Sequence, residues 1–273
     1  MHSEGHPCRR APKCRQQALW RAGNTTRRRT HMTLSGRKVL ITGGSAGIGA
    51  ATARALTDQG ARVAVLARDG ERLRAIAHDV GALPVPADLR DPDAVPQAVE
   101  AAAGELGGLD ALVNNAGSFR LGAVHDGRYA DWREMVELNI LGLLAASQAA
   151  VPFLARSGSG QLINISSMSG RGGAGAVTGV YAGTKHAVHA ISDGLRDELH
   201  GHGIRVTVLS PGMVLTNRGE YISDPQLRDV TARWHEQQGL DPADVAAQVC
   251  HVLAAPPDVH LVEIALISAR QTP

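Results

Sequence analysis

The sequence has few aromatic residues, few cysteines and no long apolar run. Phe, Trp and Tyr make up 3% of its 273 residues, so a core must be built from Ala, Val, Leu and Ile. Three cysteines are too few for a disulfide framework. No apolar run reaches the roughly 18 residues that cross a bilayer, and the N-terminus lacks the apolar segment of a secretory signal. We therefore expect a soluble protein in the reducing cytoplasm.

Charge is distributed unevenly along the chain. Residues 1–31 hold eight of the 28 Lys and Arg residues but one of the 26 acidic residues, which leaves 20 basic and 25 acidic residues beyond them. This segment has no apolar periodicity, so we expect a disordered basic tail, with translation beginning at Met32. Metal binding, organelle targeting and nucleic-acid binding by the tail are weaker alternatives. The mildly acidic remainder predicts no nucleic-acid partner.

Strands and helices alternate beyond residue 32. The pattern predicts strands at 37–41, 62–66, 83–85, 109–113, 161–165, 205–209 and 261–267, and helices at 48–59, 70–79, 92–106, 132–155, 181–200 and 242–254. Such alternation indicates βαβ units around a parallel sheet. We expect residues 32–273 to form one α/β domain, a single doubly wound, Rossmann-type parallel sheet with helices on both faces.

A glycine-rich turn follows the first expected strand and opens the first helix. It reads Thr42-Gly43-Gly44-Ser45-Ala46-Gly47-Ile48-Gly49. Glycines allow a tight turn and let the backbone approach a pyrophosphate, whose charge the helix N-terminus stabilises. An ordinary strand-to-helix loop is the alternative, but such a loop rarely needs three of these glycines. The placement between strand and helix favours a dinucleotide site.

A tyrosine and a lysine stand four residues apart at the start of an expected helix. Tyr181 and Lys185 therefore share one helix face. A free phenol has a pKa of about 10, and a nearby ammonium together with an oxidised nicotinamide lowers it by roughly 1–3 units. The pair is thus suited to acid/base exchange near neutral pH. A chance contact on a helix surface is the alternative.

Several motifs occur in a familiar order. After the glycine-rich turn come Asn114-Asn115-Ala116-Gly117, Leu138-Asn139-Ile140-Leu141-Gly142, Ser167-Met168-Ser169-Gly170, the Tyr181/Lys185 pair and Ser210-Pro211-Gly212-Met213-Val214-Leu215-Thr216. Together they resemble the signature of the short-chain dehydrogenase/reductase family over residues 36 to about 267. The C-terminal run 254–264 is similar to a subgroup containing NADP-dependent 3-hydroxy acid and serine dehydrogenases and clavulanate-type reductases, although their usual Arg-Pro-Thr ending is absent.

The resemblance implies four catalytic residues. Tyr181 would act as the acid/base and Lys185 would also hold the nicotinamide ribose. Ser167 would polarise the substrate carbonyl. Its separation from Tyr181 is one residue longer than usual in the family, which leaves Ser166 and Ser169 as substitutes. Asn139 would bind a water molecule in a proton relay; a packing asparagine bonded to neighbouring backbone is the alternative.

The expected cofactor is NADP, with NAD less favoured. Ala67 stands where an NAD enzyme usually has an acid, and the guanidinium of Arg68 can pair with a 2′-phosphate. Asp69 could take the acid's place if the alignment is shifted. Asp88 would contact the adenine edge, unless it caps the next helix. The full expected cofactor set is Thr42, Gly43, Ser45, Gly47, Ile48, Gly49, Arg68, Asp88, Asn115, Ala116, Gly117, Tyr181, Lys185, Pro211, Gly212 and Thr216.

These expectations combine into an NADP(H)-dependent oxidoreductase that reduces a small-molecule carbonyl or oxidises a secondary alcohol by hydride transfer. The alternative is a non-catalytic NADP-binding sensor or scaffold. We expect no metal site, no membrane or nucleic-acid partner, and a homodimer or homotetramer paired through the helices 132–155 and 181–200. Phe119, Met168, Met213 and Trp234 are candidate substrate contacts, while Arg120, Arg171 and Arg218 are candidates to bind a substrate carboxylate. The histidines His186, His189, His200 and His202 are interpreted as helix-surface residues.

Overall fold

Seven parallel strands form one sheet in the computed structural model, which describes residues 33–68, 70–172, 175–216 and 225–271. The predicted basic tail, Asp69 and Arg218 lie outside the described residues. The sheet order is β3-β2-β1-β4-β5-β6-β7. The strands are β1 (Lys38–Thr42), β2 (Arg62–Ala67), β3 (Leu83–Pro86), β4 (Ala111–Asn114), β5 (Gln161–Ile165), β6 (Arg205–Pro211) and β7 (Glu263–Leu266).

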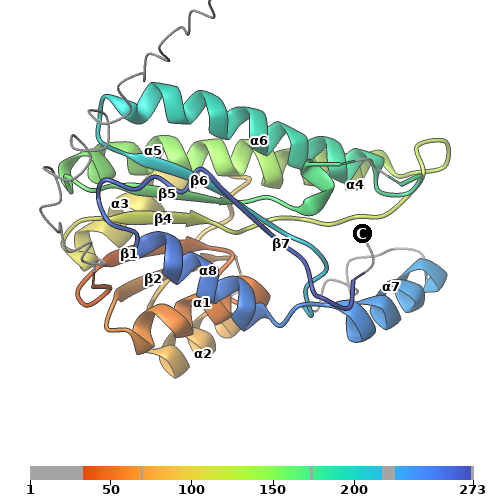
Figure 1. The fold of residues 1–273 in the computed structure, drawn as a ribbon, viewed down its shortest axis with the longest axis horizontal. Coiled ribbons are helices and arrows are strands. Elements are labelled where there is room, and N and C mark those ends of the chain that lie inside the picture. Colours follow the sequence, from red (N-terminus) through yellow and green to blue (C-terminus); the bar gives the residue numbers. More distant parts are fainter. Residues whose placement is uncertain (1–32, 69, 173–174, 217–224, 272–273) are drawn as a thin grey trace, which may run out of the picture. The chain divides into compact units, whose positions relative to one another are not determined.

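Helices cover both faces of this sheet (Figure 1). One face carries α1 (Gly47–Asp58), α2 (Gly70–Val80) and α8 (Pro242–Leu253). The opposite face carries α3 (Ala94–Leu106), α5 (Leu143–Arg156) and α6 (Gly179–His200). The predicted doubly wound α/β architecture is therefore confirmed.

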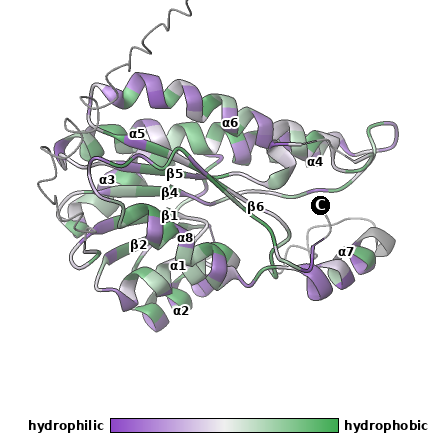
Figure 2. Cartoon of the chain, viewed as in Figure 1, coloured by the Kyte–Doolittle hydropathy of each residue, from purple (hydrophilic) through white to green (hydrophobic). Residues whose placement is uncertain are grey.

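Alternating strand side chains build the two halves of the core. In β1, Val39 and Ile41 pack into the cluster under α1 and α8, whereas Leu40 packs into the cluster under α3 and α5. Successive side chains of a strand point to opposite faces, so a strand covered on both sides must be apolar at every position. Figure 2 shows this as largely hydrophobic central strands between helices of mixed character.

Local signals set several helix ends. Asp241 and Asp244 form a reciprocal capping box at the start of α8, with Pro242 in the first helical position, where its missing N–H costs nothing. Gly107 ends α3 in the left-handed conformation, with φ of 73°, which glycine adopts without steric cost. These residues explain why the predicted boundaries of both helices lie close to the observed ones.

The predicted helix at 132–155 is a composite. It consists of α4 (Tyr129–Val136), a π-helical segment η1 (Glu137–Gly142) and α5. Contrary to the sequence expectation, this continuous helix, Tyr129–Arg156, is long and apolar enough by length and composition alone to cross a membrane. Its inner side packs Ala146, Ala150 and Leu154 into the core of the sheet, as the core helix of a globular domain also does.

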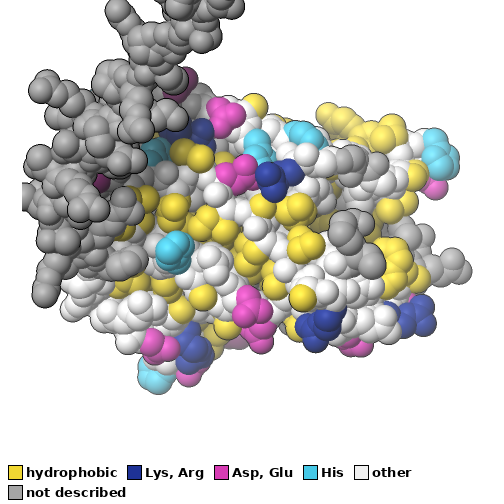
Figure 3. All heavy atoms as spheres, viewed as in Figure 1, with side chains coloured by type: hydrophobic (Ala, Val, Ile, Leu, Met, Phe, Trp, Pro, Cys, Tyr) yellow, Lys and Arg dark blue, Asp and Glu magenta, His cyan; other side chains and the backbone are white. Residues whose placement is uncertain are grey.

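Two further elements lie where no regular structure is predicted. A short 3-10 turn, η2 (Met168–Gly170), follows β5, and α7 (Pro225–Gln238) lies within the stretch interpreted as variable. The turn η2 directly follows β5, and α7 comes after β6 in the chain. In Figure 3, the face turned to the viewer carries hydrophobic side chains between separate Lys and Arg groups, several of them next to Asp or Glu.

Candidate active site

The glycine-rich turn and the Asn-Asn-Ala-Gly motif meet at the carboxyl ends of β1 and β4. These adjacent strands mark the point where the strand order reverses, the usual ligand-binding crevice of such sheets. The Thr42 hydroxyl oxygen accepts hydrogen bonds from the backbone N–H groups of Asn115 and Ala116, each at 3.1 Å. The Asn115 side chain donates to the carbonyls of Thr42 and Gly43 at 3.0 and 3.1 Å. The two motifs therefore form one rigid unit.

The turn can pack this tightly against the neighbouring backbone only because its residues are glycines. Gly43 has a φ of 67°, and a Cβ there would lie 2.8 Å from the Ala116 Cα. A Cβ on Gly49 would collide with the Gly43 carbonyl. No side chain caps the first turn of α1, so the amides of that turn are suited to an anion. The arrangement fits the pyrophosphate of a dinucleotide, with Ser45, Gly47 and Ile48 in the same turn.

Strand β2 ends at Ala67, and Arg68 is exposed immediately after it. Ala67 and Arg68 therefore lie at the end of β2, as the sequence predicts. Arg68 acts electrostatically on Asp88, which follows β3 on the neighbouring strand.

Asp88 is bound by a residue that sequence reasoning missed. The Arg90 guanidinium donates to both carboxylate oxygens of Asp88, at 2.6 Å from Nη2 and 3.1 Å from Nε. This hydrogen bonding, with a smaller opposing effect of burial, lowers the pKa of Asp88 below its ordinary value. The predicted helix-capping alternative does not apply, because Asp91 instead accepts from the backbone of Asp93 and Ala94.

Tyr181 and Lys185 are buried in the first turns of α6, at 3% and 5% exposure. The Lys185 ammonium donates to the Ile165 carbonyl at 2.9 Å, at the end of β5. Phe119 packs edge-on against the Tyr181 ring, with centroids 4.7 Å apart. Strand β5, the loop after β4 and α6 therefore fix the pair from three sides.

The three serines after β5 differ in their surroundings. The Ser166 hydroxyl donates a hydrogen bond to the Lys185 carbonyl at 3.2 Å, so it is bound to the backbone of α6. The Ser167 hydroxyl oxygen accepts the N–H of Ser169 at 3.2 Å and begins η2. All three serines line the same cavity as Tyr181.

Asn139 lies within the π-helical segment and is 1% exposed. Its side-chain oxygen accepts from the Ser118 N–H at 2.7 Å, and its amide nitrogen donates to the Ser118 carbonyl and the Thr184 hydroxyl at 3.0 Å each. A Cβ on Gly117 would lie 3.2 Å from the Asn139 oxygen and 3.7 Å from Lys185 Nζ. Asn139 thus bonds to neighbouring backbone, as expected for a packing asparagine. It also lies close to Lys185.

The Pro-Gly segment after β6 reaches the glycine-rich turn. A Cβ on Gly47 would lie 2.9 Å from Thr216 Cγ2, so Thr216 packs directly on the turn. The Gly212 N–H donates a hydrogen bond to the Leu266 carbonyl at 2.8 Å. The Gln271 side chain, which the sequence did not suggest, accepts from the Met213 N–H at 3.0 Å and covers Gly212.

A cavity of about 300 Å³ opens beside Tyr181. Its lining includes all four predicted substrate contacts, Phe119, Met168, Met213 and Trp234, together with Ile48, Leu121 and Val230. Helix α7 contributes Thr231 and His235, which sequence reasoning missed because their helix was not predicted. The lining places an apolar surface next to the Tyr181 and Ser167 hydroxyls.

Two of the arginines considered for a substrate carboxylate are held by glutamates. Arg120 donates to Glu134 at 2.7 Å and lines a separate cavity of about 320 Å³ beside α4. Arg171 pairs with Glu263 at 2.9 Å. Neither belongs to the lining of the Tyr181 cavity, and Arg218 lies outside the described residues.

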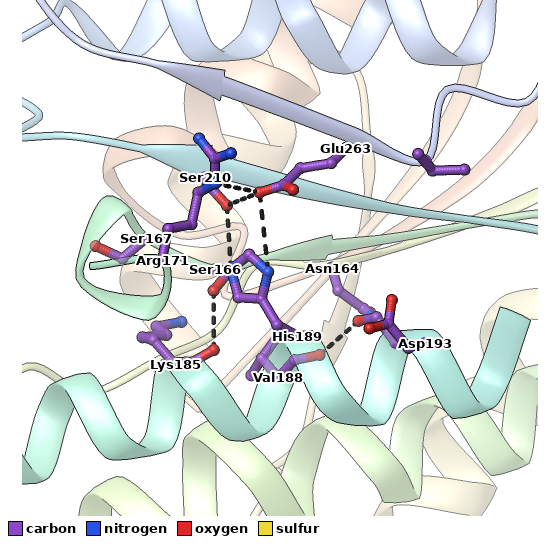
Figure 4. A network of polar contacts seen from close by, with 12 residues as sticks. Asn164, Ser166, Ser167, Arg171, Lys185, Val188, His189, Asp193, Ser210 and Glu263 are labelled. Atoms are coloured by element: carbon purple, nitrogen blue, oxygen red, sulfur yellow. Dashed lines mark hydrogen bonds and ion pairs between the residues drawn. The ribbon is translucent and has the colours of Figure 1, made fainter. Parts of the chain in front are cut away.

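The interpretation of His189 as a helix-surface residue is wrong. Its side chain is 21% exposed, with Nδ1 3.8 Å from Glu263 and Nε2 3.3 Å from the Ser210 hydroxyl (Figure 4). Burial is the main cause that lowers its pKa below the ordinary value. His186, His200 and His202 are exposed, as predicted. In the described ranges, no group of three His, Cys, Asp or Glu side chains could hold a metal ion.

Known proteins are similar to this chain along most of its length. The family model for short chain dehydrogenases matches residues 37–226. An uncharacterized oxidoreductase of Staphylococcus aureus (strain MW2) is 35% identical over 236 residues, which cover 85% of this chain and 96% of that protein. The closed form of serine dehydrogenase complexed with NADP+ superposes with a TM-score of 0.80 at 30% identity, covering 86% of this chain and 96% of that one. Alcohol dehydrogenase from the archaeon Thermococcus sibiricus, complexed with 5-hydroxy-NADP, gives a TM-score of 0.77 at 29% identity, covering 87% and 99%.

Proposed function

Because the chain belongs to the short-chain dehydrogenase family, we propose that it is an NADP(H)-dependent oxidoreductase interconverting a small-molecule carbonyl and a secondary alcohol. The observation that carries the proposal is the buried Tyr181/Lys185 pair, which opens with Ser167 onto an apolar cavity. The similar structures with bound NADP and 5-hydroxy-NADP support the choice of cofactor.

Three groups of residues would hold the cofactor. The turn residues Thr42, Gly43, Ser45, Gly47, Ile48 and Gly49 would bind the pyrophosphate. Arg68 and Asp88 would bind the adenosine end. Asn115, Ala116, Gly117, Tyr181, Lys185, Pro211, Gly212 and Thr216 would bind the nicotinamide end.

In the reductive direction, NADPH held by these residues would supply the hydride that the carbonyl carbon accepts. Tyr181 donates its phenolic proton to the carbonyl oxygen, which completes the alcohol. Ser167 donates a hydrogen bond to that oxygen as negative charge develops on it. Lys185 stabilises the phenolate left on Tyr181, and Asn139 holds the loop at Ser118 against α6. In the oxidative direction, Tyr181 accepts the proton from the alcohol.

The cavity lining supports a proposal for the substrate class. The lining favours a carbonyl with an apolar or aromatic substituent, because such a substituent would bury its apolar surface against Phe119, Met168, Met213 and Trp234. The glutamate partners of Arg120 and Arg171 disfavour a carboxylate substrate. The proposal also includes a cytoplasmic location and a catalytic domain at residues 32–273.

A substrate screen tests the proposal. Purified protein is mixed with NADPH and separate panels of neutral ketones, semialdehydes and 3-oxo acids, and nicotinamide absorbance is followed. We expect turnover with neutral, apolar carbonyls. Tight NADPH binding without turnover on any panel would favour the non-catalytic sensor or scaffold instead.

A further inference from the structure

Glu263 is the centre of a polar network whose members do not line the Tyr181 cavity (Figure 4). Its Oε1 atom lies 2.9 Å from Arg171 Nε, 3.3 Å from the Ser210 hydroxyl oxygen and 3.8 Å from His189 Nδ1. The Ser210 hydroxyl also lies 3.3 Å from His189 Nε2. One carboxylate oxygen therefore connects side chains from three other segments of the chain.

The partners of Glu263 lie next to residues of the proposed reaction. Arg171 directly follows η2 and donates its N–H to the Met168 carbonyl at 3.0 Å. Ser210 directly precedes Pro211, in the segment proposed to hold nicotinamide. His189 lies one helical turn after Lys185 on α6.

The turn that carries Ser167 rests directly on α6. A Cβ on Gly170 would lie 2.8 Å from the Lys185 carbonyl oxygen and 2.9 Å from His189 Cδ2, so any displacement of η2 is limited on that side. On the other side, Arg171 is held by Glu263 of β7. The position of Ser167 relative to Tyr181 thus depends on contacts from both α6 and β7.

We propose that Glu263 is a positioning residue for carbonyl reduction. Through Arg171 it holds the Ser167 turn, and through Ser210 it holds the start of the Pro211 segment, both in register with Tyr181. The inference rests on the proposed function, because it assigns a role in that reaction. Glu263 itself does not line the cavity and touches neither the glycine-rich turn nor Arg68.

The serine, histidine and glutamate of this network have the composition of a hydrolytic triad. A nucleophilic serine must reach a substrate carbonyl, but Ser210 is fully buried within the sheet, at 0% exposure. The geometry therefore favours positioning over a second activity.

A double-mutant cycle tests the role. Glu263→Gln keeps the length of the side chain and removes its charge, whereas Arg171→Met removes the guanidinium. We expect each variant to lower kcat about tenfold, within the loss of about 100-fold that a displacement of 1 Å can cause. The double variant should be no slower than Glu263→Gln alone, because Arg171→Met removes a contact that Glu263→Gln already weakens.

Measuring turnover per bound NADPH distinguishes a loss of positioning from a loss of folded protein. NADPH binding, followed by nucleotide fluorescence, should keep its Kd within about twofold, since the proposed pyrophosphate and adenosine contacts lie outside the network and only the Pro211 segment at the nicotinamide end adjoins it. Asp79→Asn, which breaks an exposed ion pair with Arg54 between α1 and α2, is the matched control and should retain wild-type kcat.

The outcomes distinguish two failures. If wild type turns over but Glu263→Gln and Arg171→Met both keep wild-type kcat per bound NADPH, or their effects add in the double variant, the positioning role is wrong while the proposed function stands. If wild-type protein reduces no carbonyl, or Tyr181→Phe is as active as wild type, the proposed function falls and this inference falls with it.

Discussion

Lys185 lies one helical turn after Tyr181, with its Nζ atom 6.0 Å from the centroid of the Tyr181 ring. A hydrogen bond to the Ile165 carbonyl fixes that ammonium at the end of β5. Both side chains are almost fully buried, where a charge interacts more strongly than in water. The lysine is therefore placed to stabilise the negative charge that develops when Tyr181 gives up its proton.

The cofactor preference should depend on the end of β2. Arg68 can form charge-assisted hydrogen bonds to a 2′-phosphate, which correspond to about 10- to 100-fold discrimination. We expect wild type to prefer NADPH over NADH by at least about tenfold in kcat/KM. Arg68→Ala should remove most of that preference, and Ala67→Asp should shift it towards NADH.

Steady-state kinetics with both cofactors measure this preference. The matched control is Arg62→Ala, at the opposite end of the same strand, which should leave the ratio unchanged. Equal use of the two cofactors by wild type, or an equal loss for both in Arg68→Ala, would show that the strand end is misaligned. Asp69 would then be the residue to replace.

Asn139→Ala should destabilise the protein. The variant leaves the buried Ser118 N–H and the Thr184 hydroxyl without the amide that joins them. Loss of a buried hydrogen-bond partner costs about 1–3 kcal/mol in the free energy of unfolding. Thr184→Val removes the Asn139 contact and the hydroxyl's hydrogen bond to the Tyr181 carbonyl within α6, but it leaves the Ser118 contacts in place and should cost about 1 kcal/mol.

Urea unfolding gives both free energies, and turnover gives the functional comparison. We expect Asn139→Ala to lose turnover beyond its loss of folded protein, and Thr184→Val to keep wild-type turnover. Equal stability of Asn139→Ala and wild type would contradict the observed hydrogen bonds.

The catalytic motifs could be predicted because each depends on neighbouring residues. Tyr181 and Lys185 share a helix face through their spacing alone, and the glycine-rich turn is defined by its place between a strand and a helix. The π-helical segment around Asn139 could not be predicted, since π and α turns differ in backbone hydrogen bonding and not in hydropathy pattern. Helix α7 was missed because its polar sequence gives no clear apolar periodicity.

The error at His189 has a different cause. Its partners come from β6 and β7, which are brought to α6 only by the parallel pairing of β5 with β6 and of β6 with β7. The same holds for Gln271, which reaches Met213 across the end of the sheet. Contacts between segments distant in sequence depend on strand order, which the hydropathy pattern does not specify.

Acid should destabilise the protein through two partly buried histidines. Burial is the main cause that lowers the pKa of His189 and of His260, so the folded chain binds these protons less readily than the unfolded chain, where the pKa is about 6.5. The free energy of unfolding is therefore greatest above about pH 6.5 and falls as pH drops towards the lowered folded pKa values. Asp88, whose pKa is lowered mainly by Arg90, contributes only at more acidic pH.

Urea unfolding of wild type, His189→Gln and His260→Gln at about pH 7.5 and 5.5, on either side of the ordinary histidine pKa, checks this expectation. Each variant should show a smaller decrease between the two pH values than wild type. His78→Gln, at an exposed position of α2, is the control and should decrease as wild type does. An unchanged free energy of wild type across this range would refute the assignment.

We expect a homodimer or homotetramer. The continuous helix Tyr129–Arg156 exposes Val136, Leu141 and Leu144, at 40%, 55% and 37%, a row that a second copy could cover. Light scattering at micromolar concentration should give a multiple of the 28.6 kDa chain mass. Leu141→Glu should shift the mass towards that of one chain, and a monomeric wild type would exclude the assembly.

Turnover of Tyr181→Phe tests the central claim most directly. The substitution removes only the hydroxyl that donates the proton, and the ring can keep its packing against Phe119. With an NADPH Kd like that of wild type, the variant should lose about 100- to 10,000-fold in kcat, the contribution of a positioned general acid. Retention of more than about a tenth of wild-type kcat at unchanged NADPH binding would contradict Tyr181 as the acid/base.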